Sequence, residues 1–313
     1  MSKEIPLLSS KKSATGAAPH SPPAWYVLFL FTLPPLLWAC NYIVGKAVRN
    51  DIPPVGLTFM RWLVALVVIL PFAFPYIKRD FRRYREYAGW IIAVSVTGIV
   101  CFSLLVYIGL HHTSSTNALL LNSCIPVLIM LFGALFFGHK LSIKQVVGLA
   151  ISCCGVLFII FKGDIHGLMQ MAFSSGDLML LAAMACFALY TLWIRKIPSD
   201  ISRMGLLGVQ VAIALVVTLP LWLHEISTGA VPHWNTMTVS AVVFLGVFPS
   251  FVSYLLYGRC VETVGAARAG LSIHLIPVFG VVLSLIFLGE TLHLFHIIGI
   301  ATILVGVALA SRR

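Results

Sequence analysis

Length, composition and charge exclude a water-soluble globule. The chain has 313 residues, of which 60% are hydrophobic and 10% are charged, whereas soluble domains carry about 25% charged residues. The formal net charge is +11 and the mean hydropathy is +1.00. The apolar residues form continuous runs of about 20, the length that a membrane helix needs, and not the alternating ten-residue segments of a membrane barrel. An all-α polytopic membrane protein follows.

The runs divide the chain into a tail and ten predicted spans. Residues 1–24 are rich in Ser, Pro, Ala and Lys, which predicts a disordered cytoplasmic tail. Clusters of charge, proline and glycine then separate the apolar runs. The predicted spans are residues 25–47, 55–77, 88–110, 114–137, 143–161, 175–194, 204–224, 237–258, 266–289 and 294–311.

The basic residues indicate how these spans are oriented. Connections rich in Lys and Arg stay in the cytoplasm, and 17 of the 21 Lys and Arg residues fall on one predicted face. Three fall on the other face, and Arg61 lies inside a span. The bias predicts that both termini are cytoplasmic. It also explains the positive net charge, so nucleic acid is not an expected partner.

The two halves of the chain are similar to each other. Residues 136–148 (FFGHKLSIKQVVG) match residues 287–299 (FLGETLHLFHIIG). Each half then contains five predicted spans, over residues 25–161 and 175–311. Because five is odd, the two copies must have opposite orientations in the membrane, as in secondary transporters built from inverted repeats.

These landmarks resemble the EamA-type transporters of the drug/metabolite transporter superfamily. The resemblance rests on LLWACNYIVGKA at 36–47, on the arginine of FMRW at 59–62, and on the proline, G-x-x-L and spaced glycines that end each repeat. It implies ten transmembrane helices, arranged as two inverted five-helix repeats around a central cavity. Members of the family transport amino acids, nucleobases, nucleosides, sugar derivatives or toxic organic compounds, often outward.

The chain departs from the family pattern at two places. The family has Gly-Glu at the end of the fourth span and again at the ninth. Glu290 keeps this pattern, but the first copy has His139 instead. The Trp-Gly of the first span reads Trp-Ala here, with Ala39 in place of the glycine. The first departure weakens any mechanism that relies on the first glutamate.

Three residues of the first span are candidates for substrate binding. Asn41 lies about six residues inside the outer end of the span, and its amide offers two donors and an acceptor. Trp38 shares its helical face, whereas Tyr42 is turned about 100° away. Aromatic walls suit an amphipathic or ring-bearing substrate. The alternative for Asn41 is a contact between helices, worth about 0.6 kcal/mol on average.

Arg61 is the basic residue inside a predicted span, about 9 Å below the outer boundary at 1.5 Å per residue. Its side chain either extends back to the interface or places a positive charge at the mouth of the cavity, where it would attract carboxylate or phosphate groups. Asn122 and Tyr190 are further candidate cavity residues, because polar groups in membrane helices avoid lipid.

Proton coupling has one candidate group. All ten carboxylates lie in loops or at span edges, so the usual midmembrane carboxylate carrier is missing. His274 lies near the middle of the ninth span, three residues before Pro277, and histidine titrates near neutral pH. It is either a proton carrier or a neutral histidine bonded to a neighbouring helix.

The leading interpretation is a secondary transporter in the bacterial inner membrane, which exports small metabolites such as amino acids, nucleobases or nucleosides by alternating access. Both a proton antiporter and a facilitator fit. An organellar nucleotide-sugar or phosphate-ester exchanger is the alternative, but it needs several cations inside the membrane. An intramembrane lipid-modifying enzyme would need a nucleophile, an acid/base pair or metal ligands at membrane depth.

The partners follow from this interpretation. We expect a small-molecule substrate, the lipid bilayer and, if transport is coupled, protons. No enzymatic activity, cofactor or metal is expected, and the chain should be a monomer or a weak dimer.

Overall fold

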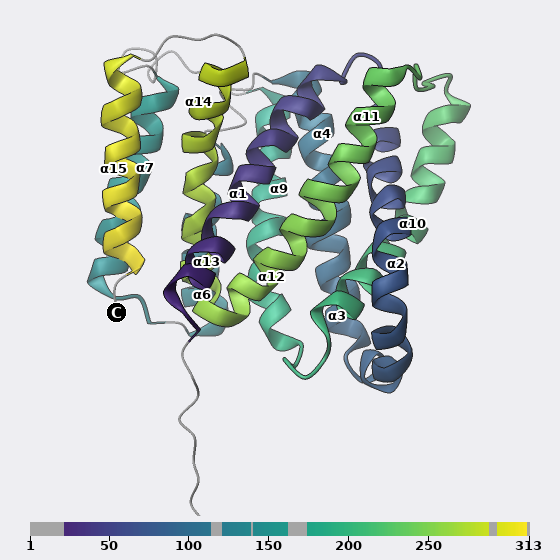
Figure 1. The fold of residues 1–313 in the computed structure, drawn as a ribbon, viewed down its shortest axis with the longest axis horizontal. Coiled ribbons are helices and arrows are strands. Elements are labelled where there is room, and N and C mark those ends of the chain that lie inside the picture. Colours follow the sequence, from purple (N-terminus) through teal and green to yellow (C-terminus); the bar gives the residue numbers. More distant parts are fainter. Residues whose placement is uncertain (1–21, 114–120, 139, 162–173, 288–292, 312–313) are drawn as a thin grey trace, which may run out of the picture.

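The computed structural model describes residues 22–113, 121–138, 140–161, 174–287 and 293–311. Every regular element within these ranges is a helix (Figure 1), which confirms the all-α prediction for the described part of the chain. Seven of the described helical stretches are long and apolar enough to cross a membrane. Three shorter apolar helices accompany them, at Ile125–Phe137, Ile143–Ile159 and Leu294–Ala310.

The first half of the chain contains α1 (Ala24–Ala47), α2 (Pro54–Glu86), α3 (Ala88–Ser95), the π-helix η1 (Val96–Cys101), α4 (Phe102–His112), α6 (Ile125–Phe137) and α7 (Ile143–Ile160). The second half contains α9 (Ser175–Trp193), the short 3-10 helix η2 (Ile194–Lys196), α10 (Arg203–Ser227), α11 (Thr236–Leu245), the π-helix η3 (Gly246–Val252), α12 (Ser253–Val264), α13 (Ala266–Leu271), the 3-10 helix η4 (Ser272–His274), α14 (Leu275–Phe287) and α15 (Leu294–Ser311).

Helix α2 continues beyond the predicted end of the second span at residue 77. The basic segment that follows contains no glycine or proline, so nothing in it interrupts the helix. Arg82 and Arg83 form ion pairs with Glu86 along its surface. The charge pattern therefore located the edge of the apolar run, whereas the helix itself ends nine residues later.

Two π-helices interrupt the long helices at corresponding places in the two halves. At η3 the cause is Pro249, which has no backbone N–H to donate. The hydroxyl of Ser250 donates to the carbonyl of Leu245, five residues earlier, at 2.7 Å. At η1 the side chain of Tyr190 packs directly on Gly98. A Cβ at this position would lie 2.2 Å from Cδ2 of Tyr190, so the contact needs glycine.

Helices α7 and α15 pack side by side and run antiparallel (Figure 1). A Cβ on Gly148 would lie 2.6 Å from the carbonyl oxygen of Gly306, and one on Gly155 would lie 2.8 Å from that of Gly299. The absence of side chains at these four positions lets the two backbones touch. Because the earlier glycine of one helix meets the later glycine of the other, the helices point in opposite directions.

Helices α2 and α10 form a second antiparallel pair. A Cβ on Gly208 would lie 2.8 Å from Cβ of Ala73. At the opposite end of the pair, the carboxylate of Glu225 accepts hydrogen bonds from the backbone N–H groups of Val55 and Gly56, at 3.0 and 2.6 Å. This carboxylate caps the first turn of α2, where it also complements the helix dipole.

Between these two pairs, α1 packs against α12 and α14, and α9 packs against α4 and α6. Large aromatic side chains fill the space where α9 and α12 meet, and Phe187, Tyr190, Tyr254 and Tyr257 are all nearly inaccessible to solvent. Almost all of the predicted tail, residues 1–24, lies outside the described residues, as do His139 and Glu290.

Candidate functional site

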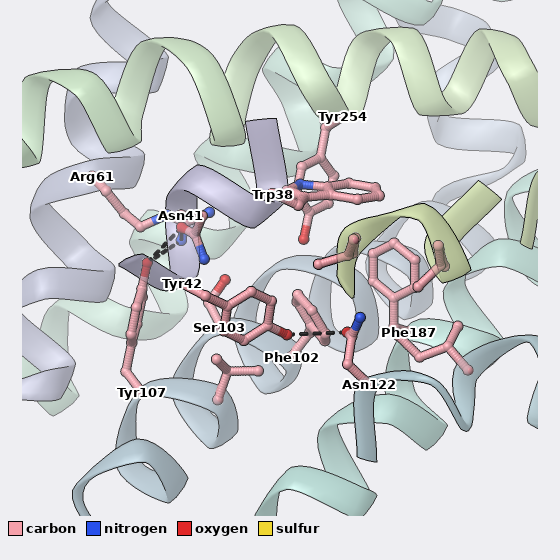
Figure 2. A pocket seen from close by; sticks show the side chains of 14 residues that line it. Trp38, Asn41, Tyr42, Arg61, Phe102, Ser103, Tyr107, Asn122, Phe187 and Tyr254 are labelled. Atoms are coloured by element: carbon pink, nitrogen blue, oxygen red, sulfur yellow. Dashed lines mark hydrogen bonds between the residues drawn. The ribbon is translucent and has the colours of Figure 1, made fainter. Parts of the chain in front are cut away.

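A narrow cavity lies at the centre of the bundle, where both halves contribute (Figure 2). Its volume is about 440 Å³ when the space between side chains and the opening are both counted. One part of the lining is polar and the rest is aromatic or aliphatic. The lining residues are Trp38, Asn41, Tyr42, Arg61, Phe102, Ser103, Val106, Tyr107, Asn122, Ile125, Phe187, Tyr254, Ile273 and Ile276.

The polar part is organised around the guanidinium of Arg61 on α2. Its Nη1 donates to Oδ1 of Asn41 on α1 at 2.9 Å and also contacts the hydroxyl of Tyr107 on α4. The Tyr107 hydroxyl in turn donates to the same Asn41 oxygen at 2.9 Å. Nε of Arg61 donates to Oγ of Ser250 at 2.8 Å. Four helical segments, α1, α2, α4 and η3, thus converge on one cation. Figure 2 shows Arg61 with Asn41 and Tyr107.

No carboxylate compensates this charge among the described residues. Arg61 is 4% exposed, and every acceptor named above is a neutral oxygen. Its guanidinium lies 5.0 Å from the ring centre of Trp62 and 5.5 Å from that of Tyr107, so cation–π attraction contributes. Burying an unpaired charge is unfavourable. A ligand that brings a negative group into the cavity would therefore be bound favourably.

Asn122, just before α6, is a further polar group of the cavity. Its Oδ1 accepts a hydrogen bond from the hydroxyl of Tyr42 at 3.0 Å. Its Nδ2 is buried and has no hydrogen-bond partner among the described residues. An unused amide donor in a dry site costs free energy. A ligand oxygen that accepts a hydrogen bond from this group would remove that cost.

Aromatic rings close the side of the cavity near α9 and α12. The ring of Trp38 lies 5.4 Å from that of Phe187 and 5.8 Å from that of Tyr254, edge to face in both cases. Its Nε1 donates to the carbonyl of Pro249 at 3.2 Å, which fixes the orientation of the indole. This wall suits an apolar or aromatic part of a ligand.

The structure brings together five of the seven residues predicted from the sequence. Trp38, Asn41, Tyr42, Arg61 and Asn122 all line the cavity. Arg61 does not extend to the interface, which was one of its two interpretations, because its hydrogen bonds hold it inside the bundle.

The other two predicted residues lie outside this cavity. Tyr190 packs behind Tyr254, with 5.9 Å between their ring centres. His274 is fully buried; its Nε2 bonds to the carbonyl of Ser123 at 3.1 Å, and its Nδ1 bonds to the hydroxyl of Ser152 at 2.5 Å. This geometry is the one expected of a histidine that links neighbouring helices.

Sequence reasoning did not single out several residues of the site, among them Tyr107, Tyr254 and Ser250. Tyr107 and Tyr254 were among several polar aromatic residues of the spans, and no pattern separated them from the others. Ser250 follows Pro249 directly, and a hydroxyl beside a proline inside a span is a signal that would have found it. The proline opens the helix there, and the serine oxygen then faces Arg61.

A bundle of apolar helices around a central cavity with a buried cation defines a membrane protein of the carrier class. The sequence model of the EamA-like transporter family matches residues 25–161 and again residues 174–312. The chain belongs to this family, as the resemblance of its motifs indicated.

Relatives agree with this assignment, and a solved structure shares the fold. The chain is 28% identical to the uncharacterized transporter YyaM of Bacillus subtilis, over 73% of this chain and 75% of that one. It is 25% identical to a probable terminal-alkyne amino-acid exporter of Streptantibioticus cattleyicolor (88% and 90% covered). It is 24% identical to a probable amino-acid metabolite efflux pump of Salmonella typhimurium (89% and 92%). A crystal structure with 19% identity has a TM-score of 0.72 and covers 91% of this chain and 96% of its own, which shows the shared fold.

Proposed function

We propose that this chain exports small amphipathic metabolites that carry a carboxylate, with amino acids as the leading class. The substrate would occupy the central cavity, which opens alternately to each side of the membrane. The carrier would consist of ten transmembrane helices in two inverted five-helix repeats, in a bacterial inner membrane and with both termini in the cytoplasm.

Arg61 is the observation that carries this proposal. A buried guanidinium without a carboxylate partner favours an anionic ligand group, and a carboxylate would accept hydrogen bonds from it with two oxygens. Nδ2 of Asn122 adds a neutral donor on the opposite side of the cavity, and the aromatic wall around Trp38 suits an apolar side chain. A small molecule with a carboxylate and an apolar side chain matches all three.

The packing of the helices supports an inverted repeat. The α7–α15 and α2–α10 pairs each join corresponding helices of the two halves, and both are antiparallel. The contacts of α1, from the first half, with α12 and α14 of the second correspond to those of α9, from the second half, with α4 and α6 of the first. The π-helices η1 and η3 also correspond. A rocking motion of the two halves would use such an arrangement.

The names of two relatives support export of amino acids. They describe a probable terminal-alkyne amino-acid exporter and a probable amino-acid metabolite efflux pump. A phosphate-ester exchanger is the alternative, and it would need several cations directed at one phosphate. Arg61 is the one cationic side chain among the described residues that line the cavity, so the carboxylate is the better match.

Counterflow in proteoliposomes tests the proposed function. Vesicles are loaded with unlabelled L-phenylalanine, L-leucine, uridine, adenine or glucose 6-phosphate, and the entry of the labelled compound is followed. We expect saturable counterflow of the amino acids. Counterflow of glucose 6-phosphate alone would favour the exchanger, and a current without saturation would indicate a channel.

The orientation has its own test. The connection between α10 and α11 lies on the outer face in our proposal, and Val231 is half exposed there. In a variant whose native cysteines are replaced, Val231→Cys should react with an impermeant thiol reagent added outside intact cells. Labelling only after the cells are opened would contradict the proposed orientation.

A further inference from the structure

A second, smaller cavity lies beside the first and shares Tyr254 with it. It holds about 220 Å³ of space between atoms, opening included. Its walls come from α9, η2, α10 and α12. The lining residues are Tyr190, Ile194, Arg203, Leu206, Leu207, Gln210, Tyr254, Leu255 and Gly258.

Two buried donors in this cavity have no acceptor among the described residues. They are Nη1 of Arg203 and Nε2 of Gln210. Arg203 is 5% exposed and Gln210 is 1% exposed, so bulk water does not reach either group freely. Two unused donors in one small cavity are unfavourable unless an acceptor enters it.

The local charge favours a negatively charged acceptor. Nε of Arg203 pairs with the carboxylate of Glu262 at 2.5 Å, and its Nη2 donates to the carbonyl of Ile197 at 3.2 Å. The same carboxylate lies 3.7 Å from the guanidinium of Arg259. One carboxylate is therefore shared by two guanidinium groups, which leaves a net positive charge beside the unused Nη1.

A tyrosine separates this cavity from the central one. The hydroxyl of Tyr254 donates to the carbonyl of Gly98 at 2.6 Å, and its ring packs against that of Tyr190. Gly98 lies in η1, and Tyr254 is the second residue of α12, which follows η3. Single π-helical turns are rare and occur frequently at functional sites, and a shift in either of these two would move this tyrosine.

We infer that the Arg203–Gln210 cavity is a second binding subsite, which takes the carboxylate of the substrate before it passes Tyr254 to reach Arg61. The inference rests on the proposed function. Arg203 begins α10, next to the basic connection at residues 195–203, so the subsite lies toward the face that we propose to be cytoplasmic. The substrate would then meet one guanidinium on each side of the tyrosine.

A cysteine at Gly258 reports on this subsite. The nearest atom to a Cβ at this position is Cδ1 of Ile194, at 3.8 Å, so a small side chain fits in the cavity. Gly258→Cys is made in a variant whose seven native cysteines are replaced, and the protein is reconstituted in proteoliposomes. Leu255→Cys serves as a second reporter if the first variant does not fold.

The measurement compares two thiol reagents of similar size, an anionic ethylsulfonate and a cationic trimethylammonium methanethiosulfonate. Each rate is divided by the rate of the same reagent with a small free thiol. On this scale we expect the anionic reagent to react about ten times faster, because the positive cavity concentrates it. Sodium acetate should slow the reaction relative to sodium chloride at equal ionic strength. Equal rates for the two reagents, no reaction at either reporter, or no protection by acetate would each overturn the inference.

Variants of the two donors connect the effect to these groups. Gln210→Met keeps the length of the side chain and removes the amide, and Arg203→Lys keeps the ion pair and removes Nη1. Neither variant changes the net charge, so each should keep the anionic preference and lose most of the protection by acetate. Thr218→Val is the matched control, since Thr218 is a buried polar residue of α10 that bonds to Ala214 and lines neither cavity. Protection by acetate retained in both donor variants would contradict the assignment.

Failure of the subsite and failure of the proposed function give different results. Protection by acetate without amino-acid counterflow would retain the subsite and overturn the proposed substrate class. Amino-acid counterflow without protection by acetate would retain the proposed substrate class and overturn the subsite. Protection by inorganic phosphate but not by acetate would replace the carboxylate with a phosphate ligand and overturn this inference.

Discussion

Arg61 and Arg203 are both buried arginines, one in each half of the chain, but their partners differ. Arg61 bonds to three neutral groups, Asn41, Tyr107 and Ser250. Arg203 forms an ion pair with Glu262. The first charge has no carboxylate partner among the described residues, and the second shares the carboxylate of Glu262 with Arg259.

This difference separates an arginine held only by neutral partners from one that also takes part in an ion pair. A buried ion pair needs both partners, and removal of one leaves a buried charge that destabilises the fold. A buried charge with neutral neighbours already lacks its counterion, so its removal relieves a cost instead. We therefore expect Arg61 to contribute mainly to transport and Arg203 to contribute strongly to stability as well.

The largest expected effect is the loss of transport in Arg61→Met. Removal of one partner of a buried charge pair costs about 2–5 kcal/mol of binding, so counterflow at low substrate concentration should fall by at least about 30-fold. The melting temperature in detergent should be unchanged or higher. Arg61→Lys keeps the charge but not the planar donors and should retain partial activity. Normal counterflow in Arg61→Met would disprove the role of Arg61 in binding.

The second prediction is that Arg203→Met destabilises the protein. Loss of one partner of a fully buried pair costs about 3–5 kcal/mol. Glu262 is partly exposed and keeps Arg259 nearby, so we expect about 2 kcal/mol, measured as a lower melting temperature in detergent. Arg203→Met with Glu262→Gln should recover much of the loss. If Arg203→Met is as stable as the parent protein, Arg203 does not differ from Arg61 in its contribution to stability.

A smaller effect is expected for Asn41→Ala. The substitution removes the acceptor that holds both Arg61 and Tyr107, so the guanidinium should lose its orientation and transport should fall about tenfold, or about 1.4 kcal/mol. Folding and expression should stay near normal. Thr97→Val is the matched control, because Thr97 bonds only to Ala93 and does not line the cavity. Unchanged transport in Asn41→Ala would make the amide a contact between helices only.

The smallest effect is expected for His274→Gln. Both ring nitrogens of His274 are bonded within the protein, and the residue lies outside the central cavity. Glutamine can replace part of this bonding. Accumulation driven by a pH gradient in proteoliposomes should therefore be the same in both proteins. If the gradient drives accumulation only in the parent protein, His274 is the proton carrier and our expectation is wrong.

Much of the fold could be predicted from the sequence because its signals are local. A run of apolar residues predicts a helix without reference to the rest of the chain, and the motif at 36–47 identified the helix that supplies Trp38, Asn41 and Tyr42. The end of α2 could not be predicted in this way. Its basic segment marks the membrane boundary, but it also favours helix, so the two boundaries differ by nine residues.

The sequence by itself determined that Arg61 lies inside a span, and that Asn41 and Trp38 share a helical face. Only the tertiary structure decided that Arg61 points inward, since this depends on Ser250 and Tyr107, which belong to other helices. A π-helical turn also adds a residue to the helix and rotates everything after it by about 100°. The side of the helix on which Tyr254 lies therefore depends on η3 and on the contacts that stabilise η3. Helical periodicity alone does not predict either one.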